Sequence, residues 1–345
     1  MFTSRFVDIG LNDRVRVGGK GASLGELTRA GIRVPPGFVV TTAAFESAMT
    51  ALDPSGAIRS RIEALQADDL GAVTRVTAEI RDQIKRAPLP AVVRDALVDG
   101  HAELCGADRD APVAVRSSAT SEDSADASFA GLQDTYLWVR GADSVVNSVR
   151  SCWASLYSVE SVSYRLRLKL PERVVAMGVV VQRMVNSHSS GVMFTRSPTT
   201  GDRSVIAIEG SWGLGSSIVS GEVTPDKYVV SKVTGEIAQR TVSQKLVQHV
   251  PDGDAGGVRV AAVEDERQRL ACLSDAEIGE LAQIAKGIER HYGAPQDIEW
   301  AIEAGCVYLL QSRPETVWAS REATPVAAPK ARAFDHVFSL LGGRR

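Results

Sequence analysis

The feature that most constrains the fold is a short segment near the C-terminal end in which polar and apolar residues alternate. Between residues 297 and 303 the side chains fall on two faces, Ile298, Trp300 and Ile302 on one and Asp297, Glu299 and Ala301 on the other. A period of two residues is typical of a half-buried strand. A second apolar run, residues 307–311, follows closely. We therefore expect an antiparallel hairpin here.

The length of the turn decides which side chains of this hairpin meet. A three-residue loop over residues 304–306 would pair Glu303 with Val307, and therefore Glu299 with Gln311. On that register the carboxylate and the amide oxygen point the same way.

A carboxylate beside an amide oxygen suits Mg²⁺, which prefers oxygen ligands and is commonly completed by substrate phosphates and water. Arg313 follows two residues after Gln311 on the same face. An ordinary cross-strand polar pair, exposed to solvent, explains the spacing of Glu299 and Gln311 equally well. The hairpin alone leaves both interpretations open.

The remaining patterns predict a mixed α/β chain. Helical spacing is clear from residue 43 to about 106, over residues 143–157, and after the S-x-x-E capping box at Ser274 and Glu277. Apolar runs typical of buried strands occur at residues 112–115, 177–181, 191–195 and 205–208. The first of these strands is expected to end where a hydroxyl-rich loop begins, at Arg116.

Composition narrows the classes of partner and location. The 345 residues carry a formal net charge of −3 and a pI near 6.0, which gives no basic field for nucleic acid. No run of residues is long and apolar enough to span a bilayer, and the N-terminus lacks a signal-peptide pattern. The four cysteines form no CxxC pair, which indicates buried thiols in a reducing compartment. We expect a cytoplasmic protein that binds neither nucleic acid nor membrane.

Two glycine-rich segments, GGKGASLGEL from Gly18 and SWGLG from Ser211, could cradle phosphate. Lys20 stands between two glycines in the first, which is expected to be a loop. Neither segment has Walker A spacing, and each taken singly is better explained as a structural turn. Arg116 could clamp a phosphate, although alone it fits a surface arginine before a solvated loop.

The five histidines are expected to be structural or exposed, because none stands in a context that marks a nucleophile. They are His101, His188, His249, His291 and His336.

Taken in order, six segments closely resemble one family. They are GGKGASLGEL, VPPGFVVTTAAF, VAVRSSATSEDSADASFAGLQDTYL, GVMFTRSPTTGD, IEGSWGLGSSIVSGEVTPDKY and PQDIEWAI followed by YLLQSRPET. Together they resemble the N-terminal ATP-grasp domain of phosphoenolpyruvate synthase, pyruvate phosphate dikinase and the rifampicin phosphotransferases, from about Val15 to Thr316. Six ordered motifs are far more specific than any one of them.

The resemblance implies an α/β (α+β) ATP-grasp fold in which two lobes clasp ATP in a cleft. The implied organisation is an N-terminal lobe over residues 1–181 and a C-terminal lobe over 182–317. Composition and apolar spacing predict a linker with a short amphipathic tail helix over residues 318–345. The apolar stripe of that tail, Phe334, Val337, Phe338 and Leu341, either docks on a partner or folds back on its own lobe.

The resemblance also implies roles for individual residues. Lys20, Arg116, Asp297 and Arg313 match catalytic positions. Glu299 and Gln311 match the Mg²⁺ ligands. Positions that bind ATP are matched by Lys20, Arg116, Gly131, Gln133, Thr135, Gln182, Met184, Val185, Glu209 and Arg313.

One departure from the family shapes the expected function. Full-length members continue into a swivelling domain whose histidine, in a TSHAA-like motif, takes the pyrophosphoryl group from ATP and leaves AMP. No such motif occurs in this sequence. The resemblance to phenylphosphate synthase, in which these parts are divided between polypeptides, implies a separate phosphohistidine subunit. Final transfer would then be to a small acceptor such as pyruvate or a phenolic or alcohol hydroxyl.

Two other functions fit the sequence. The chain could be a self-sufficient kinase that releases ADP, with the acceptor entering the cleft directly. It could instead be a catalytically silent nucleotide-binding subunit, although Lys20, Arg116, Glu299, Gln311 and Arg313 together form a fuller set than a sensor needs.

Overall fold

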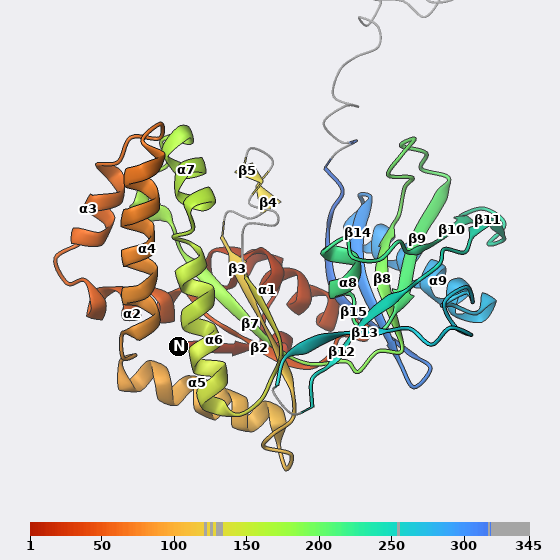
Figure 1. The fold of residues 1–345 in the computed structure, drawn as a ribbon, viewed down its shortest axis with the longest axis horizontal. Helices are drawn as coiled ribbons and strands as arrows, with labels where there is room; N and C mark the ends of the chain where they lie inside the picture. The colour runs from red at the N-terminus through yellow and green to blue at the C-terminus, as the bar shows by residue number, and fades with distance from the viewer. Residues whose placement is uncertain (121–122, 125–126, 129–133, 254–255, 317, 319–345) are drawn as a thin grey trace, which may run out of the picture.

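The computed structural model describes residues 1–316 and 318, apart from residues 121–122, 125–126, 129–133 and 254–255. It is a mixed α/β fold built on two main sheets, and all pairings between its named strands are antiparallel within the described residues. Figure 1 shows the two sheets side by side. We call the elements from β1 to β7 the N-terminal lobe and those from β8 to β15 the C-terminal lobe.

The N-terminal lobe contains a five-stranded sheet with the order β1-β2-β7-β3-β6. Its strands are β1 (Thr3–Arg5), β2 (Gly37–Val40), β3 (Val113–Ala119), β6 (Thr135–Val139) and β7 (Met177–Arg183), and a small hairpin adds β4 (Asp123–Ser124) and β5 (Ala127–Ser128). Its helices are η1 (Phe6–Asp8), η2 (Leu11–Asp13), α1 (Arg14–Arg29), α2 (Thr42–Leu52), α3 (Ala57–Glu63), α4 (Leu70–Arg86), α5 (Ala91–Cys105), α6 (Ala142–Ser155), α7 (Val159–Leu168) and η3 (Glu172–Val174). The helices expected between residues 43 and 106, and at 143–157, are therefore confirmed.

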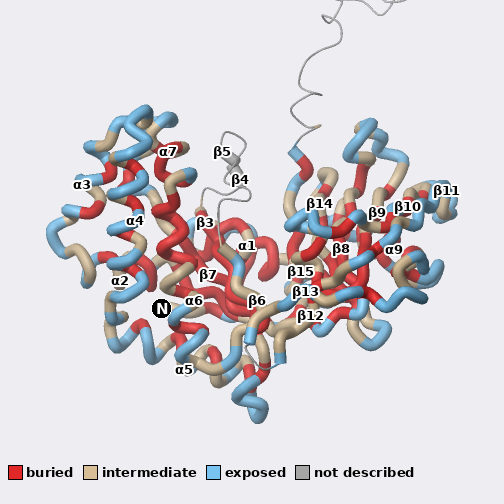
Figure 2. Tube along the Cα trace, viewed as in Figure 1, coloured by how far each residue is buried: buried red, intermediate tan, exposed pale blue. Residues whose placement is uncertain are grey.

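A helical layer covers one side of this sheet, where α2, α5 and α6 contact its strands. The expected apolar stripe of α6 is buried, and Trp153 packs edge-on against Phe45 of α2 with ring centroids 5.9 Å apart. Aromatic pairs of this geometry add to the burial of their apolar area. Figure 2 shows the buried segments concentrated between these helices and the sheet.

The C-terminal lobe contains a six-stranded sheet with the order β11-β10-β9-β8-β14-β15. Its elements are β8 (Ser189–Phe194), β9 (Val205–Trp212), α8 (Ser216–Val219), β10 (Asp226–Ser231), β11 (Ile237–Thr241), β12 (Val247–Pro251), β13 (Val258–Ala262), α9 (Asp275–Tyr292), β14 (Gln296–Glu303) and β15 (Cys306–Pro314). Strands β12 and β13 form a separate hairpin.

Helix α9 begins and ends as the sequence predicts. Ser274 and Glu277 form the expected capping box, and Gly293 ends the helix in the left-handed conformation at φ 69°. Its apolar face packs on the face of the sheet that carries Ile298 and Trp300. The other face of the sheet is thereby left for polar side chains.

Helix α1 lies between the two sheets, in contact with β3 and β7 on one side and with β15 on the other. Two hydrogen bonds fix it against the C-terminal lobe: Ser23 Oγ donates to the carbonyl of Ser312 at 2.6 Å, and His291 Nε2 lies 2.9 Å from Glu26 Oε1. The two lobes therefore meet through a helix that belongs to the first of them.

Other expectations concern boundaries and thiols. The lobe division implied by the resemblance, after residue 181, falls inside β7, and as a division into nucleotide-clasping lobes it stays a prediction. All four cysteines are free, and Cys105, Cys152 and Cys272 are buried as expected, whereas Cys306 is only partly buried because it lies at the hairpin turn. Among the helices that the structure describes, none has the length and apolar character needed to cross a bilayer. The expected tail helix over residues 334–341 lies outside the described residues.

Candidate functional site

A row of polar side chains crosses the face of the second sheet opposite α9. Strand pairing places Gln311 beside Glu299, Glu299 beside Val192, Val192 beside Glu209, and Glu209 beside Lys227. Directly paired residues of an antiparallel sheet point to the same face. The alternation that buries Ile298 and Trp300 against α9 therefore presents both Glu299 and Glu209 on the opposite surface.

The hairpin has the expected pairing of Glu299 with Gln311, but its turn differs from the expected one. Its turn has two residues, Ala304 and Gly305, with φ of 49° and 73°, so Glu303 pairs with Cys306 rather than with Val307. Two consecutive residues with positive φ favour a tight turn whose twist matches that of the strands. The predicted three-residue loop is therefore wrong.

A β-bulge restores the register further along the hairpin. Trp300 pairs with Leu309, whereas the next residue toward the N-terminus, Glu299, pairs with Gln311, so Leu310 is the extra residue. A bulge leaves its extra residue outside the regular ladder. The expected pairing of Glu299 with Gln311 is confirmed, although the sequence pattern did not predict the bulge.

Arg116 brings the two lobes together at this pair. Its Nη2 donates to Glu299 Oε2 at 2.6 Å and to Gln311 Oε1 at 2.8 Å, and its Nη1 donates to the carbonyl oxygen of Leu310 at 2.9 Å. The bulged residue thus supplies the third acceptor. Strand β3 and the β14–β15 hairpin, far apart in the sequence, thus meet at one guanidinium.

The position of Arg116 differs from the expectation of a surface arginine at the start of a loop. It lies in the middle of β3, between β6 and β7, and is 9% exposed. The strand continues through Ser117 and Ser118 because neighbouring strands and helix α1 satisfy their polar groups. Hydroxyl-rich composition had favoured a loop.

Burial and neighbouring charges shift the pKa values of the two carboxylates of β14 in opposite directions. Burial alone would raise the pKa of Glu299, but the positive charges of Arg116, Lys20 and Arg313 together hold it below its ordinary value. Burial raises the pKa of Asp297, an effect that Arg313 opposes and the charges of Glu299 and Glu315 increase. Arg313 Nη2 lies 2.7 Å from Asp297 Oδ2. Glu299 is therefore the carboxylate held most firmly in its ionised form.

The oxygen atoms of Glu299 and Gln311 fit a divalent cation. Both approach the same nitrogen of Arg116, at 2.6 and 2.8 Å, and so converge on one point that already holds positive charge. One carboxylate with one amide oxygen is a donor set typical of Mg²⁺. The remaining ligands would come from phosphate and water.

Lys20 lies on helix α1 directly after a kink, rather than in the expected loop. Gly18 interrupts the helix with φ 74°, and a Cβ at this position would lie 1.9 Å from the carbonyl oxygen of Ser118. Ser118 Oγ accepts from the amide of Gly21 at 3.0 Å and donates to the carbonyl of Val17 at 2.8 Å. The glycine-rich motif and the serine string thus form one unit that places Lys20 near Glu299.

The expected adenine-binding segment lies where β7 leaves the first sheet. Gln182 is buried and donates from Nε2 to the carbonyl of Pro35 at 3.1 Å, and the amide of Met184 donates to the carbonyl of Pro112 at 3.0 Å. Val185 is also buried. These contacts fix the connection between the two lobes.

The other expected nucleotide contacts are spread around this core. Thr135 is exposed and pairs with Arg116 across β6 and β3. Glu209 lies in the polar row, with Oε1 3.0 Å from Lys227 Nζ. Lys227 was not singled out from the sequence, although it lies within one of the six segments that resemble the family. Gly131 and Gln133 lie outside the described residues.

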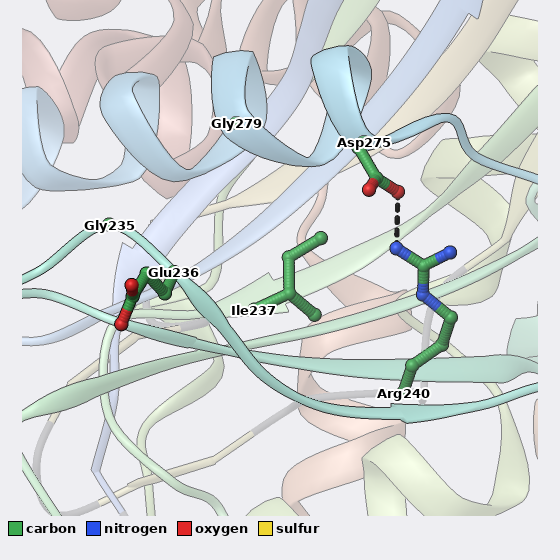
Figure 3. Close-up of a pocket in the computed structure, with 6 residues that line it drawn as sticks. All are labelled: Gly235, Glu236, Ile237, Arg240, Asp275 and Gly279. Atoms are coloured by element: carbon green, nitrogen blue, oxygen red, sulfur yellow. Dashed lines mark hydrogen bonds and ion pairs between the residues drawn. The ribbon is translucent and has the colours of Figure 1, made fainter.

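A separate hollow occurs between β11 and α9 (Figure 3). It is lined by Gly235, Glu236, Ile237, Arg240, Asp275 and Gly279, and Arg240 forms an ion pair with Asp275 across it. None of the residues expected to bind nucleotide or metal lines this hollow.

Comparisons with known proteins match this sequence to one family. The family model of the pyruvate phosphate dikinase AMP/ATP-binding domain matches residues 14–333. A probable phosphoenolpyruvate synthase of Methanothermobacter thermautotrophicus is 44% identical over 334 residues, covering 96% of this chain and 48% of the relative. The phosphoenolpyruvate synthase of Pyrococcus furiosus is 38% identical over 382 residues, covering 99% of this chain and 47% of the relative.

A rifampicin phosphotransferase of a Streptomyces species is 43% identical over 311 residues, covering 90% of this chain and 35% of the relative. The chain thus spans about half or less of the length of these curated relatives. The model match covers all the positions singled out above, from Lys20 to Arg313. The chain belongs to the pyruvate phosphate dikinase AMP/ATP-binding domain family, the ATP-binding domain of dikinase-type phosphotransferases.

Proposed function

We propose that this chain is the ATP-binding subunit of a split dikinase, with an ATP-grasp fold that activates Mg-ATP for transfer to a histidine on a partner subunit. The observation that carries the proposal is the contact of Arg116, from the N-terminal lobe, with both Glu299 and Gln311 of the C-terminal lobe, while the positive charges of Lys20 and Arg313 also act on Glu299. Family membership gives this cluster its expected ligand, a nucleotide.

Each charged group has a proposed task. Lys20, Arg116 and Arg313 would bind the phosphates and stabilise negative charge that develops during transfer. Glu299 and Gln311 would hold Mg²⁺, which supplies further charge neutralisation. Gln182, Met184 and Val185 would bind the adenine, and Glu209 would contact the nucleotide. Asp297 would keep Arg313 in place through their ion pair.

The proposed transfer runs in three steps. A nitrogen of the partner's histidine forms a bond to the β-phosphorus of ATP, and the bond from that phosphorus to the oxygen of the α-phosphate breaks, so AMP leaves. Water then attacks the γ-phosphorus of the pyrophosphohistidine and releases phosphate. The phosphoryl group left on the histidine passes to an acceptor hydroxyl, or to the enol oxygen of pyruvate.

Two observations support the partner and the acceptor. No TSHAA-like motif occurs in the 345 residues, and the proposed reaction assigns the histidine to a partner subunit. Relatives named phosphoenolpyruvate synthase and rifampicin phosphotransferase point to pyruvate or a hydroxyl compound as the acceptor. We propose a small-molecule acceptor bound outside the described residues.

The test is the identity of the nucleotide product. The purified chain is incubated with Mg²⁺ and ATP, with and without a protein that carries a phosphohistidine domain, and AMP is separated from ADP. AMP and phosphate formed only in the presence of the partner are the expected result. ADP released by the chain alone would replace the proposal with a self-sufficient kinase, and ATP binding without turnover in any mixture would favour a silent subunit.

A further inference from the structure

The guanidinium of Arg116 occupies the point at which the proposed metal ligands converge. Its Nη2 is within hydrogen-bonding distance of Glu299 Oε2 and Gln311 Oε1, and these are the oxygens that a divalent cation would need. A guanidinium and a metal ion cannot share one position, and both carry positive charge. A cation that took the position of Nη2 between these two oxygens would therefore displace the guanidinium.

The contact is strong enough to compete with a cation. The side chain of Arg116 is 10% exposed, and the bond to Glu299 is an ion pair of 2.6 Å. Charge-assisted bonds of this kind are shorter and stronger than neutral ones, and a desolvated charge must keep its partners. The carbonyl of Leu310 adds a third bond that depends on the bulge of β15.

Other positive charges strengthen the exclusion. Lys20 and Arg313 both act on Glu299 in addition to Arg116. A divalent cation that arrived alone would meet these charges at a site with one carboxylate already neutralised. A nucleotide would bring phosphate oxygens that can bind Arg116 and Lys20, which would release Glu299 and Gln311.

We infer that Arg116 is an internal counter-cation that closes the metal site and links the lobes until nucleotide phosphate draws it away. Metal binding is thereby conditional on nucleotide, so a free divalent cation does not load the site. The inference rests on the proposed function, which assigns Glu299 and Gln311 as the metal ligands. It adds an order of binding that the proposed function does not require.

The test measures Mn²⁺ binding to the full chain without nucleotide, from the electron paramagnetic resonance signal of the free ion. We expect weak binding by the unmodified chain and affinity about tenfold higher in Arg116→Met, the size of a typical coupling between sites. Adding Glu299→Gln to Arg116→Met should remove the gain. Equal affinity of the unmodified chain and Arg116→Met would overturn the inference.

Two further variants control for charge and folding. Arg140→Ala removes one positive charge from an exposed ion pair with Asp110 in the same lobe, and it should gain no Mn²⁺ affinity. Arg116→Lys keeps the charge but loses the forked geometry, so a smaller gain is expected. Circular dichroism and urea unfolding show which variants are folded. If Arg116→Met does not fold, the Mn²⁺ affinity of Arg116→Lys tests the inference instead.

A separate measurement distinguishes failure of this inference from failure of the proposed function. With a non-hydrolysable ATP analogue present, Glu299→Gln should weaken Mn²⁺ retention by the protein. If it does, and Arg116→Met shows no gain without nucleotide, the metal assignment stands and the exclusion by Arg116 is wrong. If Glu299→Gln has no effect with the analogue, both the metal assignment and the inference fail.

Discussion

In the N-terminal lobe the side chains of the site come from buried, closely packed segments, whereas in the C-terminal lobe they stand on one face of a sheet. Arg116 lies within β3, and Lys20 follows a kink that only Gly18 can form without a clash. Glu299 and Gln311 are placed by strand alternation and hairpin register. The first arrangement depends on contacts distant in sequence, and the second on neighbouring residues.

Substitutions in the two arrangements should therefore affect different properties, namely the stability of the fold in the first and the function of the site in the second. A substitution that disturbs the packing of the first arrangement should destabilise the fold, because the interior is close-packed and cannot absorb added atoms. Removal of a side chain from the open face of the second should leave the fold intact and remove function. Four predictions test this contrast, from the largest expected effect to the smallest.

Glu299→Ala should reduce partner-dependent AMP formation by about a thousandfold, since loss of a metal ligand removes several kcal/mol of transition-state stabilisation. The fold should persist, because about a third of this side chain is exposed and Arg116 keeps two other acceptors. Steady-state turnover and urea unfolding are the measurements. Glu280→Ala, which removes an exposed carboxylate on α9, is the control. Undiminished turnover of Glu299→Ala would exclude the metal role.

Gly18→Ala should lower the free energy of unfolding by about 3 kcal/mol, the sum of a positive φ and a clash in a packed site. Its Cβ would meet the backbone of Ser118, which cannot move away cheaply. Gly31→Ala is the matched control, because Gly31 has the same φ of 74° with open space around it. Gly31→Ala should lower the free energy of unfolding, measured with urea, by only about 1 kcal/mol. Equal costs would mean that the contact with Ser118 adds nothing.

Ala304→Gly should stabilise the chain by about 0.5 kcal/mol, since relief of a positive φ outweighs the added freedom of the unfolded state. Ala304 has φ 49° at the first position of the hairpin turn. Gly305→Ala, with φ 73° and no neighbouring atoms, should shift stability in the opposite direction. Chemical denaturation of the two variants measures both signs. A loss of stability in Ala304→Gly would argue against strain in this turn.

The two carboxylates of β14 should respond to pH with opposite signs. The pKa of Glu299 is lowered from 4.5, so its contribution to stability is present above about pH 4.5 and is lost as the pH falls through the lowered value. The pKa of Asp297 is raised from 3.8, so stability falls as the pH rises from about 3.8 through the raised value.

The measurement is the unfolding free energy from about pH 3 to pH 6 for the unmodified chain, Glu299→Gln and Asp297→Asn. Relative to Glu299→Gln, the unmodified chain should lose stability toward acid. Relative to Asp297→Asn, it should lose stability toward neutral pH. Slopes of the same sign would show that one of the two carboxylates has been assigned the wrong environment.

Much of the secondary structure could be predicted because its signals are local. The capping box at Ser274 and Glu277 and the alternation from residue 297 to 303 depend only on neighbouring residues, and the structure confirms both. Predictions failed where distant contacts reverse a local preference. Ser117 and Ser118, which follow Arg116, have loop composition but lie in strand β3. The backbone of helix α1 supplies the hydrogen-bond partners of the Ser118 hydroxyl.

Some contacts of the candidate site were predicted from the sequence, and others were not. The pairing of Glu299 with Gln311 was predicted from a three-residue loop that the structure does not have, and it holds because the bulge at Leu310 offsets the shorter turn. Lys227 lies within a family-like segment, but its pairing with Glu209 across β10 and β9 was not predicted. A single residue of turn length changes every pairing downstream, and composition does not encode that choice reliably.

The sequence by itself determined several of the helices and strands, the family resemblance and the face on which Glu299 stands, because periodicity and ordered motifs are properties of neighbouring residues. Only the tertiary structure decided that Arg116 crosses between the lobes to Glu299, Gln311 and Leu310, nearly two hundred residues away. The physical reason is burial. A guanidinium removed from water must find its acceptors wherever the fold brings them, and no local pattern specifies the place.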